Sequence, residues 1–170
     1  MISITDKTLQ DLEFNTILET ISAICNTEIG KQKALQIIPF KDKELLMNAL
    51  LQTFEYVSSF TNNNAIPNHG FETITSDLKM LAIEDSFLEV GSFRKMATLS
   101  ETVNVLLLFL KKFNDYYPKL NEKASEIEFT KVIIQKIDEV VDKYGEIKNN
   151  ASPDLVNIRS DMSSVRGKVN

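Results

Sequence analysis

The stretch GEIKNNASPDLVNIRSDM, Gly145–Met162, contains the signals that start a helix. Ser152 can cap the helix, Pro153 suits its first position, and Asp154 places a negative charge near the positive end of the helix dipole. From there apolar residues recur at steps of three and four, which is the spacing of a coiled-coil interface. We call these residues the C-terminal seam: Leu155, Ile158, Met162, Val165 and Val169. The sequence therefore predicts a C-terminal helix with one apolar edge, and we expect that edge to bind another helix.

The residues before this helix have the pattern of several packed helices. Asp42 can cap a helix whose apolar residues keep to steps of three and four as far as Phe60. Ser86 and Glu89 have the spacing of a capping box, which predicts a long helix from Ser86 to about Phe113. The apolar stripe of this long helix is wide, so we expect it to be the most buried element.

The domain organisation follows from where these patterns stop. The stretch TNNNAIPNHG, residues 61–70, is rich in Asn, Pro and Gly and predicts a loop. We expect a helical core domain over residues 1–151, with this loop inside it. Residues 152–170 are expected to be the start of a long helix, which is truncated at Asn170.

Composition favours an all-α fold. The chain has 170 residues, of which 43% are hydrophobic, and this is enough for one compact domain with its own core, or at most for two small ones. Five Gly and four Pro leave few breaks for the turns that a β-rich fold needs. We therefore predict an antiparallel helical bundle that ends in the long C-terminal helix. A small β-hairpin is compatible with residues 142–150, because they contain one Gly and a pair of Asn.

Charge and hydropathy restrict the possible partners. The net charge is −5, which argues against tight nucleic-acid binding by this chain alone, because that affinity comes largely from Lys and Arg. Residues 1–90 hold six Lys and Arg against thirteen Asp and Glu, whereas residues 91–170 hold thirteen against eleven. The longest apolar run, Val103–Leu110, is too short to span a bilayer, and no signal peptide is visible. We expect a cytoplasmic protein with no membrane partner.

The sequence offers no cluster of residues that predicts an active site. The single His, His69, lies in the polar loop, and the single Cys, Cys25, lies in the apolar run ILETISAIC, where we expect a buried and inert thiol. A nucleophilic Cys–His pair would require these two residues to meet, and a metal site would require further ligands. We therefore predict no catalytic, cofactor-binding or metal-binding residue in this chain, and no enzymatic activity of its own.

Segments near both ends of the chain resemble one protein family. The matching residues are Leu12-Glu13-Phe14, Thr27–Lys31 and Pro39 in the first segment, then Gly145–Ile147, Asn150–Pro153, Leu155 and Ile158-Arg159 in the second. Both segments are similar to those of the MutS-II family, the branch of MutS-like ATPases that lacks the mismatch-reading domain. The residues between them fit more loosely, in order and spacing, so the resemblance covers essentially the whole chain.

The resemblance implies that this chain is the N-terminal core and lever base of a longer protein, with the C-terminal seam on the lever helix. It implies a parent that binds and hydrolyses ATP with Mg²⁺, forms a homodimer, binds branched or otherwise non-standard DNA, and suppresses homologous recombination. Members of the family often carry a C-terminal Smr endonuclease domain and are also linked to the rescue of collided ribosomes. None of those catalytic motifs matches residues in this chain.

Two functions of different classes fit these expectations. The first is a mechanical element that links an ATPase to a DNA clamp. The second is a free-standing helical adaptor, which uses its terminal coiled coil to dimerise or to bind a partner helix. The length of the reading frame distinguishes them, because an adaptor would end at Asn170 whereas the longer protein would continue for several hundred codons.

Overall fold

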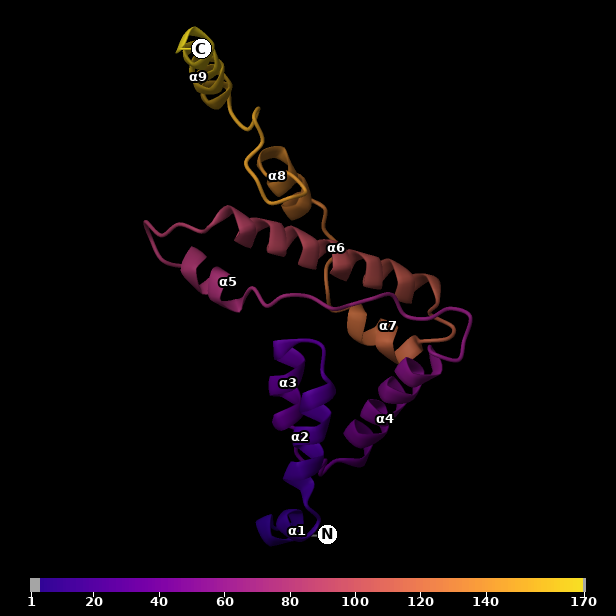
Figure 1. The fold of residues 1–170 in the computed structure, drawn as a ribbon. Coiled ribbons are helices and arrows are strands. Elements are labelled where there is room, and N and C mark those ends of the chain that lie inside the picture. The colour runs from indigo at the N-terminus through magenta and orange to yellow at the C-terminus, as the bar shows by residue number, and fades with distance from the viewer. Residues whose placement is uncertain (1–3, 170) are drawn as a thin grey trace. The chain divides into compact units, whose positions relative to one another are not determined.

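A computed structural model describes residues 4–169, with the backbone alone at residue 169. Within these residues there are nine α-helices and no β-strand, so the predicted all-α fold is confirmed (Figure 1). The helices are α1 (Asp6–Asp11), α2 (Phe14–Ile24), α3 (Glu28–Leu35), α4 (Lys43–Ser58), α5 (Thr75–Leu81), α6 (Val90–Lys112), α7 (Pro118–Ala124), α8 (Val132–Val140) and α9 (Pro153–Val169). No helix in the described range combines the length and the apolar character needed to cross a lipid bilayer.

The chain divides into two compact units. One contains the described residues up to Thr73 together with Val105–Glu128, and therefore α1 to α4, α7 and the end of α6. The other contains Ile74–Asn104 and the residues from Phe129 onward, and therefore α5, the larger part of α6, α8 and α9. We call them unit 1 and unit 2 and describe each by itself.

In unit 1, α2 and α3 form a helical hairpin. The turn between them is closed by Thr27, whose Oγ1 accepts a hydrogen bond from the backbone N–H of Gly30 at 3.0 Å. A Cβ added to Gly30 would lie 2.9 Å from this same Oγ1, so a larger residue there would require the Thr27 side chain to shift. Ser22 on α2 also donates to the backbone carbonyl of Lys31 on α3, at 3.2 Å. These contacts join the two helices close to their connecting turn.

Unit 1 also contains a buried polar contact between α4 and α7. Glu55 on α4 is only 7% exposed, and its two carboxylate oxygens accept hydrogen bonds from the backbone N–H groups of Lys119 and Leu120, at 2.9 and 2.8 Å. Tyr117, which precedes α7, is fully buried, and its hydroxyl donates to the backbone carbonyl of Asn64 at 2.9 Å. The predicted 61–70 loop is thus present and is fixed at one point by a buried tyrosine.

In unit 2, α6 and α8 share the hydrophobic core. The buried residues of this core are Met96 and Ala97 on α6, Ile137 on α8, and Val141 directly after α8. A buried amide extends the contact, because Asn104 on α6 donates to the backbone carbonyl of Thr130 at 2.6 Å and accepts from its N–H at 3.3 Å. The paired amide of Asn104 therefore holds the chain just before α8, and apolar packing holds the end of α8 against α6.

The predicted start of the long helix at Ser86 is wrong. α6 begins at Val90, and the Ser86 hydroxyl donates to the backbone carbonyl of Met80 instead of capping the following turn. Residues 86–89 are not helical, and Leu88 packs against the unit 2 core. Ser86 thus completes the turn after α5, and this competing local hydrogen bond delays the start of α6.

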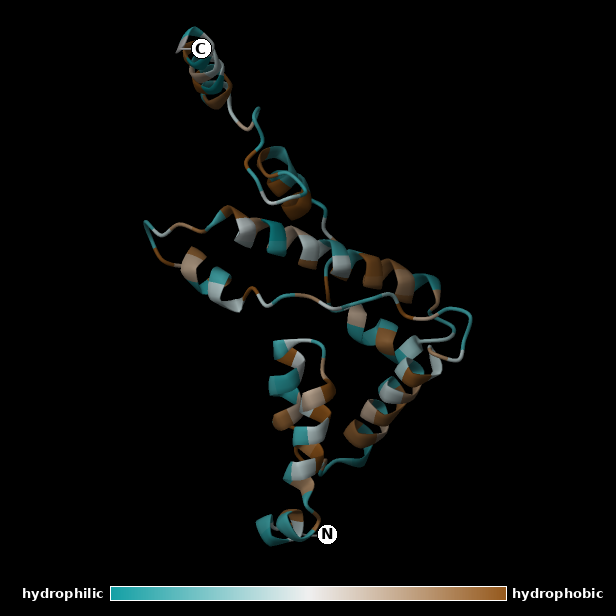
Figure 2. Ribbon diagram, viewed as in Figure 1, coloured by the Kyte–Doolittle hydropathy of each residue, from teal (hydrophilic) through white to brown (hydrophobic). Residues whose placement is uncertain are grey.

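The apolar stripe of α4 is present but largely exposed. Leu50, Phe54 and Val57 on α4 and Phe60 just after it are all exposed, although their spacing marks one side of the helix. Figure 2 shows several hydrophobic residues along the α4 ribbon. In α6, by contrast, the stripe around Met96 is buried or half-buried. Periodicity therefore predicted both helices, but it did not distinguish a stripe that packs from one that does not.

Candidate functional site

The candidate site is the segment that leads into α9, residues 141–150, which we call the root loop. An isolated antiparallel bridge joins Val141 and Ile147, so the predicted hairpin at 142–150 is present as a single bridge and does not extend into strands. The backbone N–H of Asp142 donates to the carbonyl of Glu146 at 2.8 Å. Gly145 has φ +83°, a left-handed conformation that glycine adopts without strain. The root loop is therefore a tight reversal with a defined backbone.

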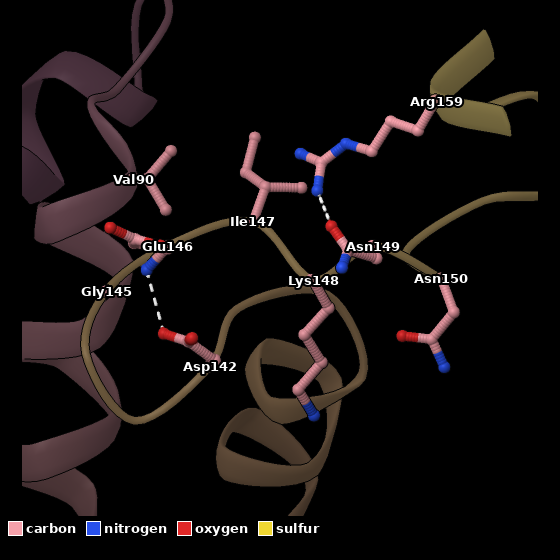
Figure 3. A pocket seen from close by; sticks show the side chains of 9 residues that line it. All are labelled: Val90, Asp142, Gly145, Glu146, Ile147, Lys148, Asn149, Asn150 and Arg159. Carbon is pink, nitrogen blue, oxygen red and sulfur yellow. Dashed lines mark hydrogen bonds between the residues drawn. The ribbon is translucent and has the colours of Figure 1, made fainter. Parts of the chain in front are cut away.

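The Asp142 carboxylate stabilises this reversal from inside. It accepts hydrogen bonds from the backbone N–H groups of Tyr144 and Glu146, at 2.8 and 2.9 Å. Figure 3 shows the bond from Glu146. The hydrogen bond from Glu146, together with that from Tyr144, holds the pKa of Asp142 below its ordinary value, because both favour the ionised form. The nearby charge of Lys148 acts in the same direction. At pH values above the ordinary pKa range of aspartate, this carboxylate is therefore ionised and accepts both hydrogen bonds within the loop.

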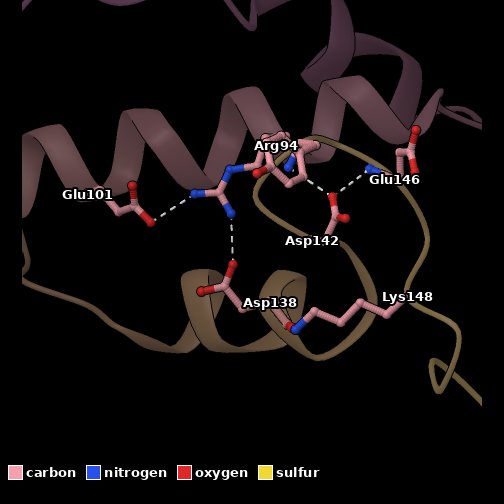
Figure 4. Close-up of polar contacts among 7 residues, drawn as sticks. Arg94, Glu101, Asp138, Asp142, Glu146 and Lys148 are labelled. Carbon is pink, nitrogen blue, oxygen red and sulfur yellow. Dashed lines mark hydrogen bonds and ion pairs between the residues drawn. The ribbon is translucent and has the colours of Figure 1, made fainter.

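Arg94 on α6 connects the root loop to the two core helices of unit 2. Its guanidinium donates to the carboxylates of Asp138 at 2.7 Å and Glu101 at 2.9 Å (Figure 4). Lys148 of the root loop donates to the backbone carbonyl of the same Asp138. Burial of Arg94 lowers its pKa, but the hydrogen bonds from its guanidinium to Asp138 and Glu101 outweigh this and raise the pKa above its ordinary value. The guanidinium is therefore a fixed positive charge between α6, α8 and the loop.

Next to the root loop lies an open depression of about 660 Å³ (Figure 3). Its lining mixes polar and apolar groups and carries both signs of charge: Val90, Asp142, Gly145, Glu146, Ile147, Lys148, Asn149, Asn150 and Arg159. Arg159 from α9 donates to the side-chain oxygen of Asn149. The charged groups of Asp142, Lys148 and Arg159 are engaged with the loop and its supports, so they help to hold the start of α9.

The predicted start of α9 is confirmed in detail. The helix runs over Pro153–Val169, and the Ser152 hydroxyl accepts a hydrogen bond from the backbone N–H of Leu155 at 3.2 Å. Asp154 lies in the first turn, as the dipole argument predicts. The sequence signals for this helix were all local, which is why they could be found without the structure.

The C-terminal seam lies along this single helix. Leu155 is half-buried, whereas Ile158, Met162 and Val165 are 55%, 53% and 60% exposed. The fifth member, Val169, is within α9, but its side chain lies outside the described residues. The seam is thus an apolar edge open to a partner over its described length, and the binding of another helix there remains a prediction.

The structure gives no support for a catalytic pair of Cys25 and His69. Cys25 is half-exposed, contrary to the predicted burial, because it lies at the end of α2; its thiol donates to the carbonyl of Ile21 at 3.3 Å. His69 instead contacts Tyr56, whose hydroxyl lies 3.3 Å from its Nε2. Throughout the described range, no three or more His, Cys, Asp or Glu residues are placed to hold a metal ion.

Sequence reasoning missed the residues that hold the root loop. Arg94 and Asp138 are 44 positions apart, and neither belongs to a motif. The same holds for Glu55, which meets the start of α7 from 64 positions away. An isolated charge of this kind has no local signal, because its partner depends on how distant helices pack.

Comparison with known proteins places the chain beside one group. It is 28% identical over 171 residues to the protein named endonuclease MutS2 from Alkaliphilus oremlandii, covering 97% of this chain and 22% of that protein. It is 27% identical over 172 residues to endonuclease MutS2 from Acetivibrio thermocellus, with the same two coverages. For the protein of that name from Bacillus velezensis, identity is 25% over 166 residues, with 96% and 21% covered.

The chain spans about a fifth of the length of the curated relatives it matches. No protein-family profile matches it. The similarity covers nearly all of this chain, which agrees with the extent of the resemblance found in the sequence.

Proposed function

We propose that this chain is the N-terminal core and lever base of a MutS-like DNA-binding ATPase that suppresses homologous recombination. Its own role is mechanical: it transmits movement between an ATPase and a DNA clamp. ATP and Mg²⁺ binding and any Smr endonuclease activity belong to other residues of the longer protein, which is expected to form a homodimer. The similarity to proteins named endonuclease MutS2 supports the DNA-related part of the proposal.

The observation that carries the mechanical part is the form of α9. This helix begins at a capped residue, follows a root loop that is tied to α6 and α8, and presents Ile158, Met162 and Val165 with more than half of each side chain exposed. A stiff helix whose base is fixed in a packed unit can move as a rigid body. Its exposed apolar edge would then be covered by the helix that completes the lever.

The proposal is tested in the longer protein by placing charges on the C-terminal seam. Leu155→Asp combined with Ile158→Asp puts two carboxylates into the expected helix interface, where a buried unpaired charge is strongly unfavourable. We expect loss of ATP-dependent clamping on branched DNA, measured as the lifetime of complexes on a blocked-end DNA junction with and without ATP.

A matched control keeps the same charge change on the other side of α9. Ser160→Asp and Ser164→Asp lie off the seam, and both residues are exposed. This control should retain clamping. If the seam variant clamps and responds to ATP as well as the control does, the transmission role is wrong. If the longer protein bound ribosomes instead of DNA, its binding partner would differ but the mechanical role of this chain would not.

The reading frame provides an independent test against the adaptor. If the gene continues for several hundred codons and encodes a Gly-rich phosphate loop, the ATPase assignment is supported. If it stops directly after Asn170, α9 would instead be the dimerisation helix of a free-standing adaptor, and the proposed function would have to be abandoned.

A further inference from the structure

The direction of α9 depends on the root loop more than on the apolar side chains of the helix. Ser152 caps its first turn, and Arg159 donates to Asn149 at the end of the root loop. Ile158 and Met162, which could have packed against another helix, are both more than half exposed. Whatever holds α9 within unit 2 must therefore act mainly on residues 141–150.

The root loop is fixed at three points, and two of them lie beside Arg94 or its partner Asp138. Val141, at its first residue, is buried in the core beside α6. Lys148 donates to the carbonyl of Asp138, whose carboxylate accepts from Arg94 at 2.7 Å. Gly145 lies next to the stem of the same arginine, because a Cβ added to it would be 3.9 Å from the Cβ of Arg94.

We propose that Arg94 is a positioning residue that fixes the root loop against α6 and α8 and thereby sets the direction of α9. The inference rests on the proposed function in one respect, because the direction of α9 matters only if this helix is the start of the lever. Removing the guanidinium frees Asp138 and leaves the loop attached mainly through Val141 and Lys148.

The chemistry of the side chain explains why an arginine suits this place. Its planar fork donates in two directions, to Asp138 on α8 and to Glu101 two turns further along α6. Glu101 keeps the guanidinium from rotating, so the charge stays aimed at α8. The side chain of Arg94 is only 20% exposed, and its ion pairs are therefore less screened by solvent than those on an open surface. A lysine could satisfy one carboxylate at a time.

The inference is tested on this chain with spin labels on α6 and α9. Thr98 and Ser163 are both exposed and can be replaced by labelled cysteines, with Cys25→Ser removing the native thiol. Double electron–electron resonance spectroscopy then gives the distribution of distances between the spin labels on the two helices. We expect a narrow distribution that roughly doubles in width in Arg94→Met, because the fork that orders the loop is lost.

Amide exchange measured by NMR gives a second, local readout. The backbone N–H of Lys148 donates to the carbonyl of Val140 at 2.9 Å and closes the root loop. In Arg94→Met this amide should exchange about tenfold faster, since loss of a charge-assisted hydrogen bond lowers the cost of local opening. Amides in the middle of α6 should keep their exchange rates, so that a general loss of stability can be recognised.

Three further variants make the outcome decisive. Lys136→Met removes the same charge from α8, where Lys136 forms only an exposed pair with Glu139, and should leave the distances unchanged. Arg94→Lys should restore part of the order. Asp138→Asn breaks the ion pair but keeps the carbonyl that binds Lys148, and it serves in place of Arg94→Met if that variant loses helical content.

A broad distribution in the wild-type chain would overturn the inference, and so would equal widths in wild type and Arg94→Met. Equal broadening in Lys136→Met would also overturn it. These distances are independent of DNA and ATP. The seam variants can therefore contradict the proposed function while the role of Arg94 stands, and the reverse is also possible.

Discussion

At the scale of single residues, Glu55 shows how a buried charge can replace a local helix cap. The residue at the start of α7, Tyr117, provides no side-chain cap, so the first backbone N–H groups of that helix need another acceptor. Glu55 supplies it from α4, with both oxygens engaged. The negative charge also lies at the positive end of the short helix. One side chain thus caps α7 and joins it to α4.

We predict that Glu55→Ala destabilises the chain by about 2–3 kcal/mol, because two backbone donors lose a charged partner. Glu55→Gln should cost about 1 kcal/mol, since its carbonyl oxygen can still accept one of the two hydrogen bonds. Urea unfolding followed by circular dichroism measures both. Glu122→Ala is the control: this carboxylate is 65% exposed and pairs with the Lys119 side chain, so its loss should cost less than about 0.5 kcal/mol. A Glu55→Ala variant as stable as the control would contradict the role of the cap.

At the scale of the helices, local signals were predictable and distant ones were not. Ser152 and Asp42 both cap the helices that follow them, because a cap is decided by residues three positions apart. The capping box at Ser86 failed, since its hydroxyl found a carbonyl six positions earlier in the chain. The role of Arg94 could not be predicted from the sequence, because its ion pair with Asp138 forms only when α6 packs against α8.

We predict that the helical content of α9 responds to its two ends. A helix of 17 residues with few packing contacts is only marginally stable, so small local terms have a visible effect. Ser152→Ala removes the cap of the first turn and should weaken the helix by about 1 kcal/mol. Gly167→Ala should strengthen it by up to about 1 kcal/mol, because a Cβ there would meet nothing within 4 Å. Carbon chemical shifts of residues 153–168 report the helical content of α9 in both variants. A higher helical content in Ser152→Ala than in the wild type would refute the argument.

At the scale of the whole molecule, the two units each have their own means of stabilisation. Unit 1 contains the buried polar contacts of Tyr117 and Glu55, and unit 2 contains the apolar cluster around Met96 and Ala97 together with the buried amide of Asn104. Both units bring together segments distant in the sequence, and α6 contributes residues to both. The boundary predicted at residue 151 rests on the local signal that starts α9. The two compact units instead follow from long-range packing, which no local sequence pattern encodes.

We predict that destabilising one unit leaves the other largely unaffected. Tyr117→Phe removes the hydroxyl that binds Asn64 and should cost unit 1 about 1 kcal/mol, whereas Met96→Ala should cost unit 2 about 2–4 kcal/mol through the cavity it creates. Amide signals of the 61–70 loop and of α8 follow the units separately during urea unfolding. Each variant should lower the midpoint of its own unit, and the double variant should be additive within about 0.5 kcal/mol, since the two sites share no partner. A common midpoint that moves equally with either substitution would show instead that α6 couples the units into one cooperative structure, and a displacement at one end of that helix would then be felt at the base of α9.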